Sequence, residues 1–117
     1  MIIDMRVRPP FGTFLQDGIL YSDPAILVAQ AKIYKCEVSE AALKKDMNLF
    51  IREMDEAGVD KAVLPVRVTN NGRNDVIAEL LHQYPDKLIG MAGINPLDDI
   101  EKSLETVDEY VINGNFT

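Results

Sequence analysis

The chain has 117 residues, with 19 acidic and 12 basic side chains and a formal net charge of −7. Hydrophobic residues occupy 47% of positions and charged residues 26%, which is typical of a globular domain and argues against a disordered chain. The acidic balance argues against nucleic acid or an anionic membrane as a partner, because both require a basic surface.

The first eight residues predict a β-strand in which apolar and charged side chains alternate. Side chains two residues apart in a strand lie on the same face. Arg6 and Arg8 are therefore expected together on the face opposite Ile3, Met5 and Val7. The two prolines that follow end the strand, because proline has no N–H for a sheet hydrogen bond.

Strands and helices alternate along the rest of the chain. Asp23 and Ser39 are good helix N-caps, and Gly58 is a natural helix end. The expected elements are a loop over 11–22, helices over 24–34 and 39–57, a strand over 62–68, a helix over 74–84 capped by Asn74, a strand over 88–94 and a helix over 99–111. This alternation on short connections predicts an α/β fold with a parallel sheet and helical crossovers.

Three parallel strands make a thin sheet for a whole domain. A further strand is expected after Gly114, where three residues remain, so we expect residues 1–117 to form a single incomplete β/α domain. An open edge of a sheet invites pairing with another chain. Self-association into a homo-oligomer is therefore a structural alternative to any small-molecule function.

Few residues carry reactive chemistry. His82 is the only histidine and Cys36 the only cysteine, so a serine–histidine triad, a cysteine-rich zinc site and an internal disulfide lack the residues they need. A lone cysteine suits the reducing cytoplasm, which is the expected location. No apolar run approaches the ~20 residues that a membrane helix needs, so no membrane partner is expected.

The candidate binding residues follow the predicted strands. Arg6 and Arg8 lie at the end of the first strand, Asn70 follows the second and Asn95 follows the third. If these strands belong to a barrel, their carboxyl ends lie at its mouth, where barrel folds place their sites, so all four are candidate substrate-binding residues. Guanidinium groups match carboxylates and phosphates, which indicates a small anionic molecule as partner. The alternatives are solvated or carboxylate-paired arginines and asparagines that only form turns.

Two longer runs resemble a known family. Residues 50–64 (FIREMDEAGVDKAVL) and 84–98 (YPDKLIGMAGINPLD) resemble successive helix-to-strand steps of the amidohydrolase superfamily, in the amidohydrolase-related branch that includes aminocarboxymuconate-semialdehyde decarboxylase. The opening Ile2-Ile3-Asp4 is also similar to the opening of that family. The resemblance implies the N-terminal portion, about three strands, of a TIM-type (β/α)8 barrel that acts as a metal-dependent hydrolase or a non-oxidative decarboxylase. A complete barrel needs ~250 residues, so the chain alone is expected to be inactive.

The metal ligands that the resemblance implies are replaced in this sequence. The first strand of the family carries a His-x-His pair that binds the metal, and the matching positions are Arg6 and Arg8. Arginine stays protonated and has no lone pair to give, so it cannot bind zinc or a similar divalent ion. We expect no metal ligand in this chain, and a divalent metal in the intact protein only where other strands supply the ligands. Catalytic residues are not assigned.

Two small-molecule functions remain open. In the first, the intact protein hydrolyses or decarboxylates a small carboxylate or carbonyl substrate. In the second, the barrel contains no metal, and Arg6 and Arg8 hold a small anion without any reaction.

Overall fold

A computed structural model describes residues 1–16, 21–66, 73–95 and 97–117 of the chain. These residues form two compact units. The first unit comprises Met1–Val7 and Asp60–Thr117, and the second comprises Arg8–Val59.

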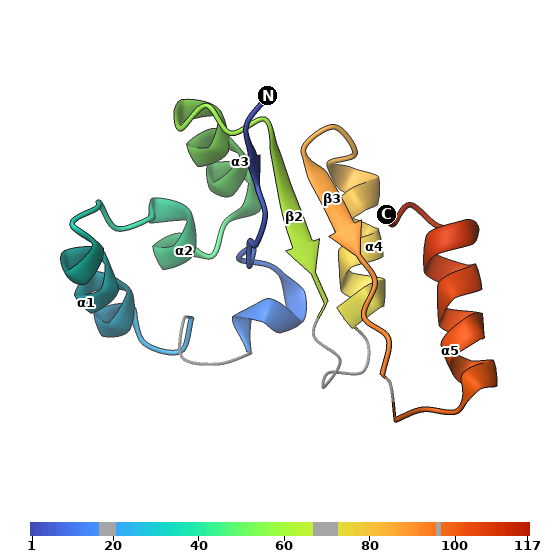
Figure 1. Ribbon diagram of the computed structural model, residues 1–117. Coiled ribbons are helices and arrows are strands. Elements are labelled where there is room, and N and C mark those ends of the chain that lie inside the picture. The colour runs from blue at the N-terminus through green and yellow to red at the C-terminus, as the bar shows by residue number, and fades with distance from the viewer. Residues whose placement is uncertain (17–20, 67–72, 96) are drawn as a thin grey trace. The chain divides into compact units, whose positions relative to one another are not determined.

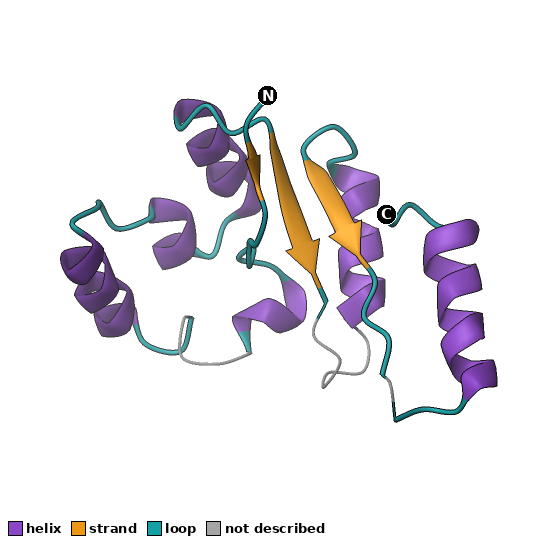
Figure 2. Cartoon of the chain, in the orientation of Figure 1, coloured by secondary structure: helices purple, strands orange, loops and turns teal. Residues whose placement is uncertain are grey.

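The first unit contains a three-stranded parallel sheet (Figures 1 and 2). The strands, in their order across the sheet, are β1 (Ile3–Asp4), β2 (Lys61–Pro65) and β3 (Leu88–Met91). Lys61 of the central strand lies opposite Ile3, and Ala62 lies opposite Leu88. A helix connects β2 to β3, as a parallel connection requires. The predicted α/β fold with a parallel sheet is confirmed.

Helix α4 (Arg73–Gln83) covers one face of this sheet. A Cβ placed on Gly90 of β3 would come within 2.7 Å of Leu81 and within 2.9 Å of Ile77 and Phe116. The glycine therefore lets the strand, the helix and the C-terminal segment approach one another closely. The buried apolar residues of the unit are Ala62, Val63, Leu64, Ile77, Leu80, Leu81, Leu88 and Phe116.

Helix α5 (Ile100–Val107) follows β3 and continues into a π-helical turn (Asp108–Ile112). The Asp99 side chain caps the helix by accepting a backbone N–H of the first turn at 2.8 Å. No residue of α5 is buried, and Ile100 and Leu104 are 77% and 62% exposed. This helix thus has apolar side chains that the described part of the chain does not cover.

The second unit is helical. A short 3₁₀ helix (Gly12–Leu15) is followed by α1 (Pro24–Tyr34), α2 (Glu40–Lys44) and α3 (Met47–Glu56). Helix α1 begins as predicted, with the Asp23 side chain accepting a hydrogen bond from Ala25 N at 2.8 Å. Among the helices of the described ranges, none has both the length and the apolar character needed to cross a lipid bilayer.

The single helix predicted over 39–57 is wrong, because two helices occupy this segment. Ser39 caps the first, which ends where Lys45 adopts a left-handed backbone with a φ of 55°. Asp46 then caps the second helix and accepts the N–H groups two and three residues later at 2.8 and 3.2 Å. An aspartate side chain satisfies the free N–H groups of a helix start. The cap at Asp46 therefore starts a new helix at a point where the spacing of the apolar residues alone would fit one long helix.

Candidate functional site

The carboxyl ends of the parallel strands lie at one edge of the sheet, where α/β folds place their binding sites (Figure 1). Strand β1 leads to Arg6 at this edge, and β3 leads to Asn95. Asn70, predicted to bind substrate, lies outside the described residues. Arg8 belongs to the second unit, so the paired anion clamp formed with Arg6 remains a prediction.

Strand β1 has one extra residue next to Arg6. In the register of the first two strand residues, Arg6 N would donate to Val63 O of β2. The hydrogen bond to Val63 O comes instead from Val7 N, at 2.9 Å. Arg6 N donates to Asp4 Oδ1 at 3.2 Å. Two residues, Met5 and Arg6, thus oppose one residue of β2, which is the arrangement of a β-bulge.

The bulge determines which face of the sheet Arg6 occupies. In an uninterrupted register Arg6 would lie opposite Leu64, on the face that α4 covers. With the extra residue it lies opposite Val63, on the face of the sheet opposite the one that α4 covers. The prediction that Arg6 lies on the face opposite Ile3 is therefore wrong. The Arg6 side chain is exposed, and its guanidinium makes no hydrogen bond or ion pair with any described residue.

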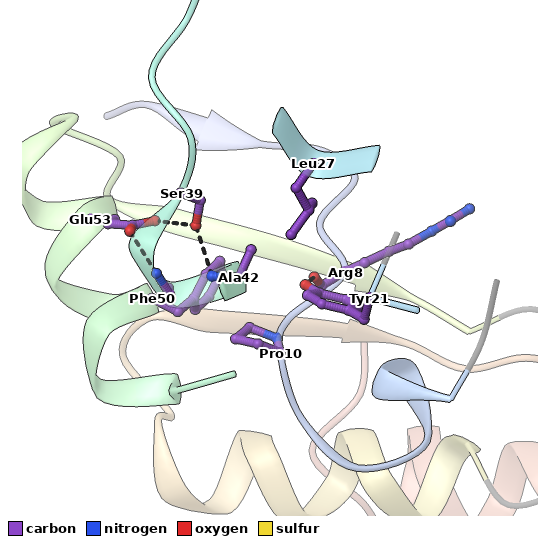
Figure 3. Close-up of a pocket in the computed structure, with 9 residues that line it drawn as sticks. Arg8, Pro10, Tyr21, Leu27, Ser39, Ala42, Phe50 and Glu53 are labelled. Carbon is purple, nitrogen blue, oxygen red and sulfur yellow. Dashed lines mark hydrogen bonds between the residues drawn. The ribbon is translucent and has the colours of Figure 1, made fainter. Parts of the chain in front are cut away.

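Arg8 lines a pocket of the second unit among the helices α1, α2 and α3 (Figure 3). Its backbone carbonyl accepts a hydrogen bond from the Tyr21 hydroxyl. Its side chain leads away from Ser39 and Glu53. Burial raises the pKa of Tyr21 to about 12, so this hydroxyl keeps its proton at neutral pH. The sequence indicated the Arg8 side chain as a candidate substrate-binding group. It did not indicate that the Arg8 carbonyl accepts a hydrogen bond from Tyr21.

Asn95 forms a turn after β3. Its side-chain oxygen accepts Leu97 N at 3.1 Å, and its amide group donates to Asp98 at 3.1 Å. These bonds are typical of an asparagine that stabilises a turn. The substrate-binding role of Asn95 stays a prediction beside this structural one.

Asn74 has a role that the sequence did not indicate. It was predicted as the N-cap of α4, but the helix begins at Arg73 and Asn74 is its second residue. The Asn74 amide donates to Gly93 O at 3.0 Å, and its side-chain oxygen accepts Gly93 N at 2.9 Å. This pair of bonds joins the helix start to the segment after β3 and satisfies backbone groups there. Arg73 beside it is 3% exposed and places a buried positive charge at the start of α4.

The residues present do not fit a bound metal. Arginine occupies both positions where the resemblance implies histidine ligands, and a guanidinium has no lone pair to donate. Across the described ranges, no three histidine, cysteine, aspartate or glutamate side chains gather as metal ligands. His82 lies on α4 and is exposed.

Comparisons with known proteins support the fold. No protein-family model matches the chain, and no match is found among curated proteins. The structure is similar to that of an uncharacterised TIM-barrel protein from Bordetella bronchiseptica, with a TM-score of 0.68 and 26% sequence identity. The match covers 95% of this chain and 40% of the other, so the chain spans less than half the length of that barrel protein. The chain therefore has the fold of a portion of a TIM-type barrel, as predicted.

Proposed function

We propose that the chain is part of an amidohydrolase-related barrel that hydrolyses or decarboxylates a small carboxylate or carbonyl substrate. The resemblance of residues 50–64 and 84–98 to that family supports the reaction class. The similarity to a TIM-barrel protein supports the fold on which such a reaction would occur.

The position of Arg6 is the observation that carries the proposal. Helices cover the outside of a TIM barrel, so the face of the sheet opposite α4 corresponds to the interior. Arg6 lies on that face, next to the carboxyl end of β1. A guanidinium there can donate two parallel hydrogen bonds to one carboxylate. Holding the carboxylate in this way orients the neighbouring bond for hydrolysis or for loss of carbon dioxide.

The proposal includes no step through a metal, because the residues of this chain do not fit one. Arg6 binds and orients the substrate, and the predicted contacts of Arg8, Asn70 and Asn95 add hydrogen bonds to its polar groups. The chain alone is expected to be inactive, and measurable turnover by these 117 residues would contradict this expectation.

Anion binding without a reaction is the second candidate function. The replacement of two histidines by two arginines favours it, because a pair of guanidinium groups repels a divalent cation and attracts an anion. The bound anion would offset the repulsion between the two positive charges.

Metal content and turnover distinguish the two functions. The protein is expressed from its complete gene, and native mass spectrometry measures the chain mass and any bound metal together. Bound metal with turnover of a small carboxylic acid supports the hydrolase or decarboxylase. Binding of acetate or inorganic phosphate, without metal and without turnover, supports the anion-binding protein.

Substitution of Arg6 tests the binding step that both functions share. We expect Arg6→Met to lower the affinity for a small carboxylate about tenfold or more, since a hydrogen bond to a charged group contributes about 1.5–3 kcal/mol. Arg52→Met is the control, because Arg52 is also exposed but pairs with Glu40 at 3.3 Å and Glu56 at 3.5 Å. Equal affinities of the two variants, measured by calorimetric titration, would refute the role of Arg6.

A further inference from the structure

Helix α1 of the second unit has an apolar face that the described residues leave uncovered (Figure 1). Within Pro24–Tyr34 only Ala31 is buried, whereas Val28 and Ile33 are 52% and 73% exposed. Lys32 lies one turn after Val28 on this face, and the helix contains no acidic residue. A helix that is apolar on most sides is normally buried by a neighbour. Helix α1 therefore presents an uncovered apolar face that carries a positive charge.

Helix α5 of the first unit has an uncovered apolar face with the opposite charge. Ile100, Leu104 and Val107 follow the spacing of one helix face, and none of them is buried. Glu101 and Glu105 lie one turn apart beside this face. Both are exposed, and no described residue forms an ion pair with either carboxylate. The apolar face of α5 is thus bordered by two negative charges.

The charges favour a contact between α1 and α5 over a contact between two copies of the same helix. Lys102 of α5 already pairs with Asp98 at 3.6 Å. Two copies of α5 would therefore bring the carboxylates of Glu101 and Glu105 together, and two copies of α1 would bring Lys32 near its own copy. Like charges at close range repel and opposite charges attract. A contact of α1 with α5 joins two apolar faces and places the lysine beside the glutamates.

We propose that two copies of the chain associate through these faces, with α1 of each copy packed on α5 of the other. Each copy has one face of each kind, so a two-fold dimer contains the same contact twice. Burial of apolar surface supplies the driving force, and the charges select the partner helix. This surface differs from the open edge of the sheet, and the association does not depend on the reaction proposed above.

The mass of the 117-residue chain in solution tests the proposal. Sedimentation equilibrium at micromolar concentration should give the mass of two chains. Lys32→Glu should weaken the dimer about tenfold or more, because it sets a carboxylate against Glu101 and Glu105 in both contacts. Lys45→Glu is the control, since it makes the same change of charge on an exposed lysine of the same unit, outside α1. A monomer at all concentrations, or equal weakening by the two variants, would overturn the proposal.

A mixture of two variants tests whether the contact lies between copies. Lys32→Glu changes α1, and the double variant Glu101→Lys/Glu105→Lys changes α5. Each variant alone has like charges in both contacts and should be mostly monomeric. In an equimolar mixture the changed α1 meets the changed α5 and the two natural helices meet each other, so the dimer should return. A mixture that stays monomeric, with both variants folded by circular dichroism, would refute the pairing of α1 with α5.

Substitution of exposed apolar residues tests the position of the contact without any change of charge. Leu104→Ser removes apolar surface from the face of α5, and Met5→Ser removes a similar amount from the open edge of the sheet. Both side chains are more than half exposed, so both variants should fold. We expect Leu104→Ser to weaken the dimer about tenfold or more and Met5→Ser to leave it unchanged. A dimer that only Met5→Ser weakens would assign the association to the sheet edge and overturn the proposal.

Discussion

Gly90→Ala tests the close approach of strand and helix in the first unit. The new Cβ would lie 2.7 Å from Leu81 Cδ1 and 2.9 Å from both Ile77 Cγ2 and Phe116 Cδ1. These three side chains are 0–6% exposed, so they have no open space into which to move. Overpacking of this kind costs about 1–3 kcal/mol, and the lower chain entropy of alanine in the unfolded state offsets about 0.4–1 kcal/mol. We expect a net loss of about 1–2 kcal/mol in the free energy of unfolding.

Urea unfolding followed by circular dichroism measures this loss. For a urea m-value of about 1–3 kcal/mol/M, the midpoint should fall by about 0.3–2 M while the m-value stays unchanged. Phe116→Leu provides the matched background, because it removes ring atoms on one side of the new methyl group. Gly90→Ala should cost less in that background than in the natural sequence. An unchanged midpoint, or an equal cost in both backgrounds, would refute the close approach.

Three further predictions concern hydrogen bonds that the structure shows. Asn74→Ala removes both side-chain bonds to Gly93 and should lower the free energy of unfolding by about 1–3 kcal/mol, measured by urea unfolding; a stability equal to that of the natural chain would contradict it. Asp46→Ala should cost about 1 kcal/mol in the same assay, because two N–H groups at the start of α3 lose their acceptor, and Asp46→Asn, which retains a capping oxygen, should cost less. The pKa of Tyr21 is raised from 10.0 to about 12, so its contribution to stability is present below pH 10 and is lost as the pH rises from about 10 to 12. Thermal unfolding across this range should show a smaller loss in Tyr21→Phe than in the natural chain, and equal losses would exclude the contribution.

Local signals in the sequence predicted the fold class and several element ends. Asp23 before Pro24 predicted the start of α1, and the alternation of strands and helices predicted the parallel sheet. These features depend on residues close together in the chain. The similarity to part of a TIM-barrel protein confirms the predicted fold at a coarser level than the family.

The features that sequence reasoning missed depend on competition or on distant partners. The break before α3 depends on whether Asp46 caps a new helix or stays inside a long one, and apolar periodicity does not decide this. The two hydrogen bonds between Asn74 and Gly93 join residues 19 positions apart. Taken separately, each of these residues is typical of an ordinary turn or helix, so neither indicates the other as its partner. The pocket gathers its lining from four separate stretches of the second unit, so no motif marks it.

Because of the bulge in β1, the face of the sheet on which Arg6 lies cannot be found by counting residues along the strand. Met5 is the additional residue, and a strand without it would still place Arg6 opposite Val63 in a regular ladder. A homologous strand one residue shorter before this position would therefore present its residue to the same face. When this chain is aligned with such a shorter strand, a gap belongs opposite Met5. Without the gap, Arg6 would be aligned with a residue of the shorter strand that faces α4.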